Sequence, residues 1–96
     1  MSNHPAIAAG RVAVVTGAAS GIGLAAVRKF GEAGMRPLLV DIDADALERA
    51  VSQLRAVGID ARAVRADVSR RDDMLRVHEE ADAFGEIAIL MNNAAR

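Results

Sequence analysis

The 96-residue sequence contains no cysteine, tyrosine or tryptophan, and Lys29 is its only lysine. Without cysteine the chain has neither a disulfide framework nor a catalytic thiolate, and it fits a reducing compartment. Without tyrosine, these residues do not support a mechanism that needs a catalytic tyrosine–lysine pair. The carboxylates are scattered and have no cysteine beside them, so we predict no metal site.

Charge and hydropathy exclude further classes of partner. Twelve basic and thirteen acidic residues give a net charge of −1, which favours neither nucleic acid nor a membrane surface. Only two phenylalanines are present to stack on bases. No apolar run approaches the roughly 20 residues that span a bilayer. We therefore predict a cytoplasmic protein with a flexible tail over residues 1–10 and one small domain over residues 11–96.

Strand and helix signals alternate along the chain. This alternation predicts a parallel sheet with helices on both faces, because parallel strands need right-handed crossovers. We expect an α/β, Rossmann-type sheet of four strands in the order 3-2-1-4 with three helices, truncated after the fourth strand. The ligand crevice should lie where the order reverses, between the first and fourth strands. The predicted strands are 12–16, 38–41, 59–66 and 87–92, and the predicted helices are 21–33, 44–57 and 70–84.

Capping residues and periodicity give the helices their expected ends and faces. Asp43 is a suitable N-cap for the second helix. Ser69 and Asp72 fit a capping box for the third. Glycines are placed to end all three helices. The apolar face expected for the first helix comprises Ile22, Ala26, Phe30 and Ala33.

The most informative segment is Thr16-Gly17-Ala18-Ala19-Ser20-Gly21-Ile22-Gly23, directly after the first strand. Its glycines have no Cβ, so they can adopt positive φ and let backbone N–H groups approach phosphate oxygens closely. The helix that follows adds the positive end of its dipole. A glycine-rich turn between a valine-rich strand and an amphipathic helix predicts a pyrophosphate site.

Asp41 ends the second strand, eighteen residues beyond Gly23. A carboxylate there is placed to accept both ribose hydroxyls of an adenosine and to repel a 2′-phosphate. The alternative is that Asp41 caps the turn before the second helix. Because Asp43 is better placed for that cap, we favour the ribose role.

Polar residues also follow the third and fourth strands. Asp67 is placed to bond an adenine amino group while Val68 packs on the ring, and a plain turn aspartate is an equal alternative. Asn92 and Asn93 close the fourth strand. For them, satisfaction of backbone groups in a turn is the stronger interpretation, with cofactor contact second.

Taken together, the segment 16–23, Asp41, Asp67-Val68 and Asn92-Asn93-Ala94-Ala95 resemble the N-terminal, cofactor-binding part of the short-chain dehydrogenase/reductase family. The resemblance covers residues 10–96. Three residues separate Gly17 from Gly21, unlike the G-x-G-x-x-G of medium-chain dehydrogenases.

The resemblance implies roles for single residues. Ser20 and Ile22 would contact the pyrophosphate, Asp41 the ribose, and Asp67 and Val68 the adenine. It further implies that Asn93 and Ala94 line the floor of the site, and that Thr16 ties the glycine loop to the fourth-strand turn. Ala95 stands where many relatives have glycine.

The resemblance implies NAD as cofactor, with NADP less favoured, because of Asp41 and because Ser20 stands where NADP-preferring members often carry a basic residue. It implies an oxidoreductase that transfers hydride between nicotinamide and an alcohol or ketone. The family's catalytic serine, tyrosine and lysine have no counterparts here, so we assign no catalytic residue and expect the 96-residue chain to be inactive. A homo-oligomer is implied for the intact enzyme.

Two other hypotheses remain open from the residues alone. One is a stand-alone nucleotide-binding or interaction module without catalysis. The other is a related site for a flavin or a methyl donor. In the isolated chain the apolar fourth strand would lack a partner strand at its outer edge, and we therefore predict self-association through this edge. A clean monomer would favour the independent module.

Overall fold

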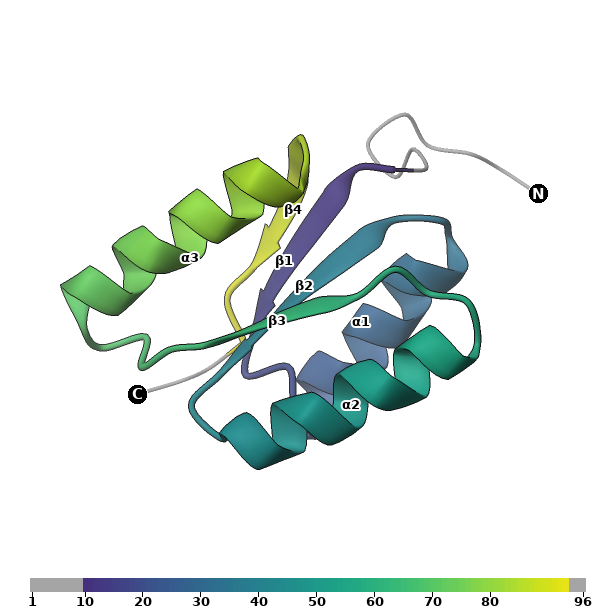
Figure 1. The fold of residues 1–96 in the computed structure, drawn as a ribbon, viewed down its shortest axis with the longest axis horizontal. Coiled ribbons are helices and arrows are strands. Elements are labelled where there is room, and N and C mark those ends of the chain that lie inside the picture. The colour runs from purple at the N-terminus through teal and green to yellow at the C-terminus, as the bar shows by residue number, and fades with distance from the viewer. Residues whose placement is uncertain (1–9, 94–96) are drawn as a thin grey trace.

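The computed structural model describes residues 10–93, which form four strands and three helices in alternation. The strands pair in parallel in the order β3-β2-β1-β4. The predicted fold and strand order are therefore confirmed (Figure 1). The strands are β1 (Val12–Thr16), β2 (Arg36–Asp41), β3 (Arg62–Arg65) and β4 (Ile87–Met91), and the helices are α1 (Gly21–Glu32), α2 (Ala44–Ala56) and α3 (Arg71–Phe84).

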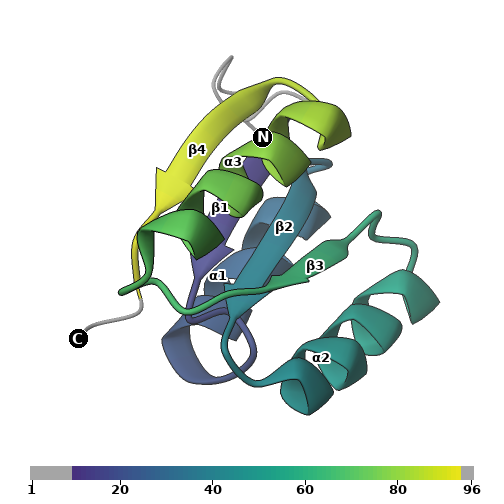
Figure 2. The same ribbon diagram turned by 60° about the vertical axis from the view of Figure 1, so that its left-hand side comes forward.

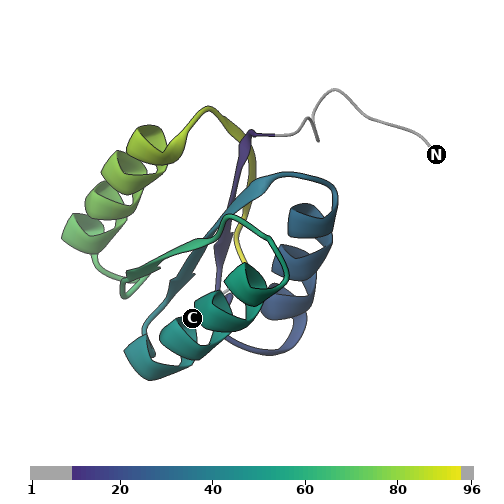
Figure 3. The same ribbon diagram turned by 45° about the vertical axis from the view of Figure 1, so that its right-hand side comes forward.

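The sheet separates two apolar cores. Helices α1 and α2 pack on one face, and α3 packs on the other (Figures 2 and 3). Side chains alternate along a strand, so Val15 of β1 points into the α1–α2 core while Val14 points toward α3. Strands β1 and β2 are consequently buried on both faces, which explains their continuous apolar runs.

Three strands differ from their predicted bounds, and β4 does so only in ending one residue early, at Met91. Strand β2 begins at Arg36, and Pro37 is its second residue. The Arg36 amide donates to Arg11 O beside β1. Alternation then directs the Pro37 nitrogen toward β3, whose pairing with β2 starts only at Leu38, so no ladder donor is lost. Strand β3 is shorter than the predicted 59–66, because the Ile59 amide turns back to donate to Leu54 O.

The capping-box prediction for α3 is wrong. Its N-cap is Arg70, which makes no capping hydrogen bond through its side chain. The Ser69 hydroxyl instead donates to Asp67 Oδ1 at 2.7 Å. A local turn before the helix therefore competes successfully for the serine.

The predicted face of α1 is also partly wrong. Ile22 is 74% exposed, whereas Gly23 and Val27 are the buried residues of the helix. Phe30 packs partly against the same core. The inward face of α1 therefore comprises positions 23, 27 and 30, which share one side of a helix. The close packing of Gly23, described below, turns this side toward the sheet.

Three glycines end the helices as predicted. Gly34 and Gly58 have φ of 93° and 87° and directly follow the C-caps of α1 and α2. Gly85 is the C-cap of α3. The predicted flexible tail lies outside the described residues except for Gly10, whose amide donates to Gly34 O at 3.0 Å.

The two edge strands of the sheet are treated differently. Near the ends of β3, Arg55 donates from Nε to Ala61 O at 3.0 Å, and Arg76 donates to Arg65 O. Strand β4 has a register irregularity beside Val12, and its Leu90 is 61% exposed. Among residues 10–93, no helix combines the length and apolarity that crossing a bilayer requires.

Phe84 joins the end of α3 to the start of β2. Its ring is 2% exposed and lies 4.2 Å from the Arg36 guanidinium carbon and 4.4 Å from that of Arg62. Arg36 also donates to Phe84 O and to Asp60 Oδ2, the latter at 2.9 Å. These contacts combine apolar burial with cation–π attraction at one point of the core.

We expect Phe84→Leu to lower the free energy of unfolding by about 1–3 kcal/mol, because it removes ring volume and both cation–π contacts. Urea unfolding monitored by circular dichroism measures the change. Leu75→Ala, at a 54% exposed position of the same helix, is the control and should cost less than about 0.5 kcal/mol. Equal losses in the two variants would contradict the assignment.

Candidate functional site

The candidate site lies at the carboxyl ends of the strands, where the connections after β1, β2, β3 and β4 meet one edge of the sheet (Figure 1). The strand order reverses between β1 and β4. In open parallel sheets this reversal opens a crevice that receives ligands. All described residues of the predicted site belong to these connections or to the strand and helix ends beside them.

A hydrogen-bonded cluster joins the glycine loop to the turn after β4. The buried Thr16 hydroxyl donates to Asn92 Oδ1 at 3.0 Å and accepts from the Asn93 amide at 2.9 Å. The Asn93 side chain donates from Nδ2 to Gly17 O at 3.2 Å. The tie expected of Thr16 is present. The asparagines satisfy backbone and hydroxyl groups, as the residue-level interpretation favoured. Ala94 and Ala95 lie outside the described residues.

The glycines of the loop have two different roles. Gly17 and Gly21 adopt φ of 63° and 60°, the left-handed conformation that glycine permits. Gly23 does not have positive φ. A Cβ on Gly23 would lie 2.2 Å from Gly17 O and 2.9 Å from Asn93 Nδ2. Gly23 is therefore needed for the close approach of α1 to the loop.

The N-terminus of α1 is suited to an anion. Its N-cap, Ser20, has extended backbone, is exposed and makes no capping hydrogen bond through its side chain. The first turn contains no acidic residue. A Cβ built on Gly21 would meet nothing within 4 Å, so the backbone there is open to an approaching group. The partial positive charge of the helix end is thus accessible, as a pyrophosphate site requires.

Asp41 holds two turns at once. Its Oδ2 accepts from the Ala19 amide of the glycine loop at 3.1 Å, and its Oδ1 accepts from the Asp43 amide at 3.1 Å. Asp43 caps α2 by accepting from the Ala46 amide, as predicted. Asp41 therefore shares the turn-forming role that we had assigned to Asp43. Each carboxylate oxygen can accept a second hydrogen bond, so this geometry is compatible with a ribose as well.

The bond between Ala19 and Asp41 was not predicted from the sequence. It spans 22 positions and places the carboxylate beside the loop that would hold phosphates. No local pattern signals such a bond, because neither residue type demands the other. Only the adjacency of β1 and β2 brings the two together.

Asp67 forms the turn between β3 and α3. Its Oδ1 accepts from the Ser69 amide at 2.9 Å and from the Ser69 hydroxyl. The adjoining Ala66 amide donates to Asp41 O at 2.9 Å, so this loop is attached to the end of β2. The turn role is present, and Val68 is half-buried beside it.

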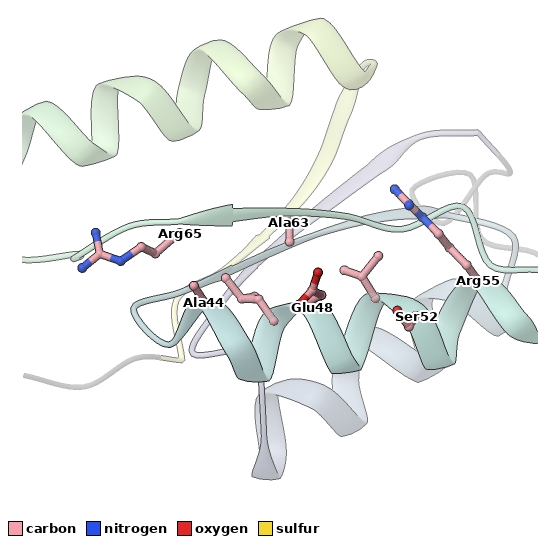
Figure 4. A pocket seen from close by; sticks show the side chains of 8 residues that line it. Ala44, Glu48, Ser52, Arg55, Ala63 and Arg65 are labelled. Carbon is pink, nitrogen blue, oxygen red and sulfur yellow. The ribbon is translucent and has the colours of Figure 1, made fainter.

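Two hollows lie away from these residues. A groove of about 400 Å³ separates α2 from β3, with Glu48 between them and Arg55 and Arg65 toward its two ends (Figure 4). A smaller cavity of about 90 Å³ lies between α3, β1 and β4, and the exposed His78 lines it beside apolar residues. Neither hollow contains a residue of the glycine loop. Within residues 10–93, no three potential metal-ligating side chains form a group.

We expect Gly23→Ala to destabilise the protein by about 1–3 kcal/mol, because its methyl group would overlap Gly17 O. Chemical denaturation measures the loss. Ala25→Ser, which adds one atom at an exposed position of the same helix, should change stability by less than about 0.5 kcal/mol. A Gly23→Ala protein as stable as the unchanged chain would show that the contact is not limiting.

Comparison with known proteins identifies the family of this chain. A family model for short chain dehydrogenases matches residues 11–96. The chain is 45% identical over 85 residues to 1-deoxy-11-beta-hydroxypentalenate dehydrogenase of Streptomyces exfoliatus. The aligned region covers 88% of this chain and 31% of that protein. The chain is also 39% identical over 94 residues to 3beta-hydroxysteroid dehydrogenase 2 of Eggerthella lenta. This aligned region covers 97% of this chain and 36% of that protein.

Solved structures agree with these relatives. A short chain dehydrogenase/reductase from Burkholderia phymatum, in complex with NAD, matches with a TM-score of 0.81 and 42% identity, over 85% of this chain and 30% of that one. L-sorbose reductase from Gluconobacter frateurii, complexed with NADPH and L-sorbose, matches with a TM-score of 0.86 and 37% identity, over 92% and 34% of the two chains. The chain spans about a third of the length of the curated relatives it matches. It belongs to the short chain dehydrogenase/reductase family.

Proposed function

We propose that this chain forms the NAD-binding part of an oxidoreductase that transfers hydride between a nicotinamide cofactor and an alcohol or ketone. The observation that carries the proposal is the bond from the Ala19 amide to the Asp41 carboxylate. It holds the Asp41 carboxylate, which we propose as the ribose ligand, directly beside a glycine loop whose helix end is open to phosphate. The family and the cofactor complexes of its relatives support the same assignment.

The residues fit each part of the cofactor in turn. The pyrophosphate would lie against the backbone of 17–22, with Ser20 and Ile22 exposed beside it. The adenosine ribose would bond to Asp41. The adenine would lie at Asp67 and Val68, and Asn93 would line the floor beside Gly17, with Ala94 and Ala95 next in the chain.

We propose NAD in preference to NADP. A 2′-phosphate on the ribose would approach the Asp41 carboxylate, and two anions at that distance repel one another. Solved relatives include complexes with NAD and with NADPH, so the family alone does not decide the preference. The choice rests on the charge at Asp41.

The bound nicotinamide would supply or accept the hydride, while the residues of this chain bind and orient the adenosine half. The chain contains no tyrosine, and Lys29, its only lysine, is exposed in the last turn of α1. We therefore expect the purified 96-residue chain to show no turnover of alcohols with NAD. Measurable turnover by the pure chain would overturn this division of roles.

Substitution of Asp41 tests the cofactor preference. We expect Asp41→Ala to weaken NAD binding about tenfold or more, because hydrogen bonds to a charged group are lost. We expect the ratio of NAD to NADP affinity to fall by at least about tenfold, because the repulsion of the 2′-phosphate is lost as well. Calorimetric titration with the two cofactors side by side measures both. The ratio isolates the ribose, because both cofactors share the pyrophosphate.

Asp45→Ala is the matched control. Asp45 lies in the first turn of α2, is exposed and carries the same charge. It should leave both affinities within about twofold. An unchanged ratio in Asp41→Ala would remove Asp41 from the ribose role. Absence of binding of both cofactors to the unchanged chain would overturn the proposed function for this chain.

A further inference from the structure

We propose that Asp73 is a positioning residue that fixes the loop of residues 67–70 and thereby sets the adenine preference of the cofactor site. Arg76 supports it from the next turn of α3. This inference rests on the proposed function, because it concerns the adenine end of the same site. It adds two residues that neither the glycine loop nor the strand-end motif indicates.

Asp73 bonds the loop through its backbone. Its Oδ2 accepts from the Asp67 amide at 2.8 Å, and its side chain is only 15% exposed. Its Oδ1 lies 3.4 Å from Arg76 Nη1. Arg76 also donates to Arg65 O, at the end of β3. The first two turns of α3 thus bond to the chain on both sides of Ala66.

The loop is fixed at its beginning as well. The Ala66 amide donates to Asp41 O at 2.9 Å, which attaches the loop to the proposed ribose residue. Asp67 follows directly, and its carboxylate is oriented by the Ser69 amide and hydroxyl. With Ala66 and Asp67 both held, the direction of the Asp67 carboxylate relative to Asp41 is set. Asp73 thus adds a bond at the Asp67 amide to those that the Ala66 and Arg70 amides make to Asp41 O and Asp67 O.

The Asp73 carboxylate is charged at neutral pH, which strengthens its bond with the Asp67 amide. The Asp67 amide lowers the pKa of Asp73 below its ordinary value, and nearby Arg76 and Arg70 lower it further against the opposing effect of desolvation. The carboxylate is therefore ionised throughout the neutral range. A charged acceptor makes a stronger hydrogen bond to a backbone amide than a neutral one.

The base at the adenosine end provides the test. ADP and GDP share the ribose and pyrophosphate, but adenine presents an amino donor where guanine presents a carbonyl oxygen. The Asp67 carboxylate would accept from the adenine amino group and would repel the guanine oxygen. The ratio of ADP to GDP affinity therefore reports the position of Asp67, whereas Asp41 and the glycine loop affect both ligands.

We expect Asp73→Ala to weaken ADP binding to the 96-residue chain about tenfold while changing GDP binding less than about twofold. Asp73→Asn should recover part of the loss, because its amide oxygen still accepts a hydrogen bond. Asp72→Ala removes the same charge from the neighbouring, exposed position in the same helical turn and should change neither affinity. Calorimetry measures all four proteins. An unchanged ADP affinity in Asp73→Ala, or equal losses for ADP and GDP, would overturn the inference.

A second measurement needs no ligand. Hydrogen exchange followed by NMR reports the Asp67 amide directly, and we expect Asp73→Ala to speed its exchange at least about tenfold while core amides of β1 keep their protection. Unchanged exchange at Asp67 would overturn the inference whatever the binding results. If the unchanged chain binds neither nucleotide, the proposed function fails for this chain. Faster exchange in Asp73→Ala would then still support the hold of Asp73 on the loop.

Discussion

The close contact between α1 and the glycine loop is the constraint on which the rest of the site depends. At Gly23 the helix packs so closely on Gly17 O that no Cβ fits between them. This contact turns positions 23 and 27 toward the sheet and leaves Ile22 exposed at the helix start. It also holds the N-terminus of α1 at the crevice. A looser contact would move the open helix end away from the strands that supply the polar residues.

The two strand-end aspartates each serve the fold before any ligand arrives. Asp41 accepts from Ala19 and Asp43, and Asp67 accepts twice from Ser69. A carboxylate that is already bonded to backbone amides is oriented in advance, so ligand binding need not fix its rotamer. The structural and the ligand interpretations of these residues are therefore complementary. We had treated them as competing alternatives.

The sequence was sufficient for most of the fold, because its signals were local or periodic. The alternation of apolar runs with amphipathic segments predicted the parallel sheet, and the dinucleotide-binding arrangement predicted its strand order. Asp43 and the helix-ending glycines were identified from neighbouring residues. The errors arose where a contact distant in sequence decided the outcome. Gly23 is required by Gly17 and Asn93, and the face of α1 follows from that packing rather than from the apolar pattern. Ser69 does not cap α3 because its hydroxyl donates to Asp67 instead.

The same distinction applies to the site. The residue types at the strand ends indicated where a dinucleotide would be placed, but the bonds from Ala19 to Asp41 and from Asp67 to Asp73 had no sequence signal. One depends on the pairing of β1 with β2, and the other on where α3 begins. Both became visible only once the elements were placed in space.

Two arginines of neighbouring helices make the β3 edge of the sheet less accessible to another strand than the β4 edge. Arg55 and Arg76 occupy the carbonyls of Ala61 and Arg65, so a strand that approached this edge would have to displace two charged side chains. At the opposite edge, β4 presents the exposed Leu90 next to the cavity under α3. A strand pairing with this sheet would therefore meet less obstruction beside β4 than beside β3. A strand at that position would separate the crevice between β1 and β4 from the sheet edge.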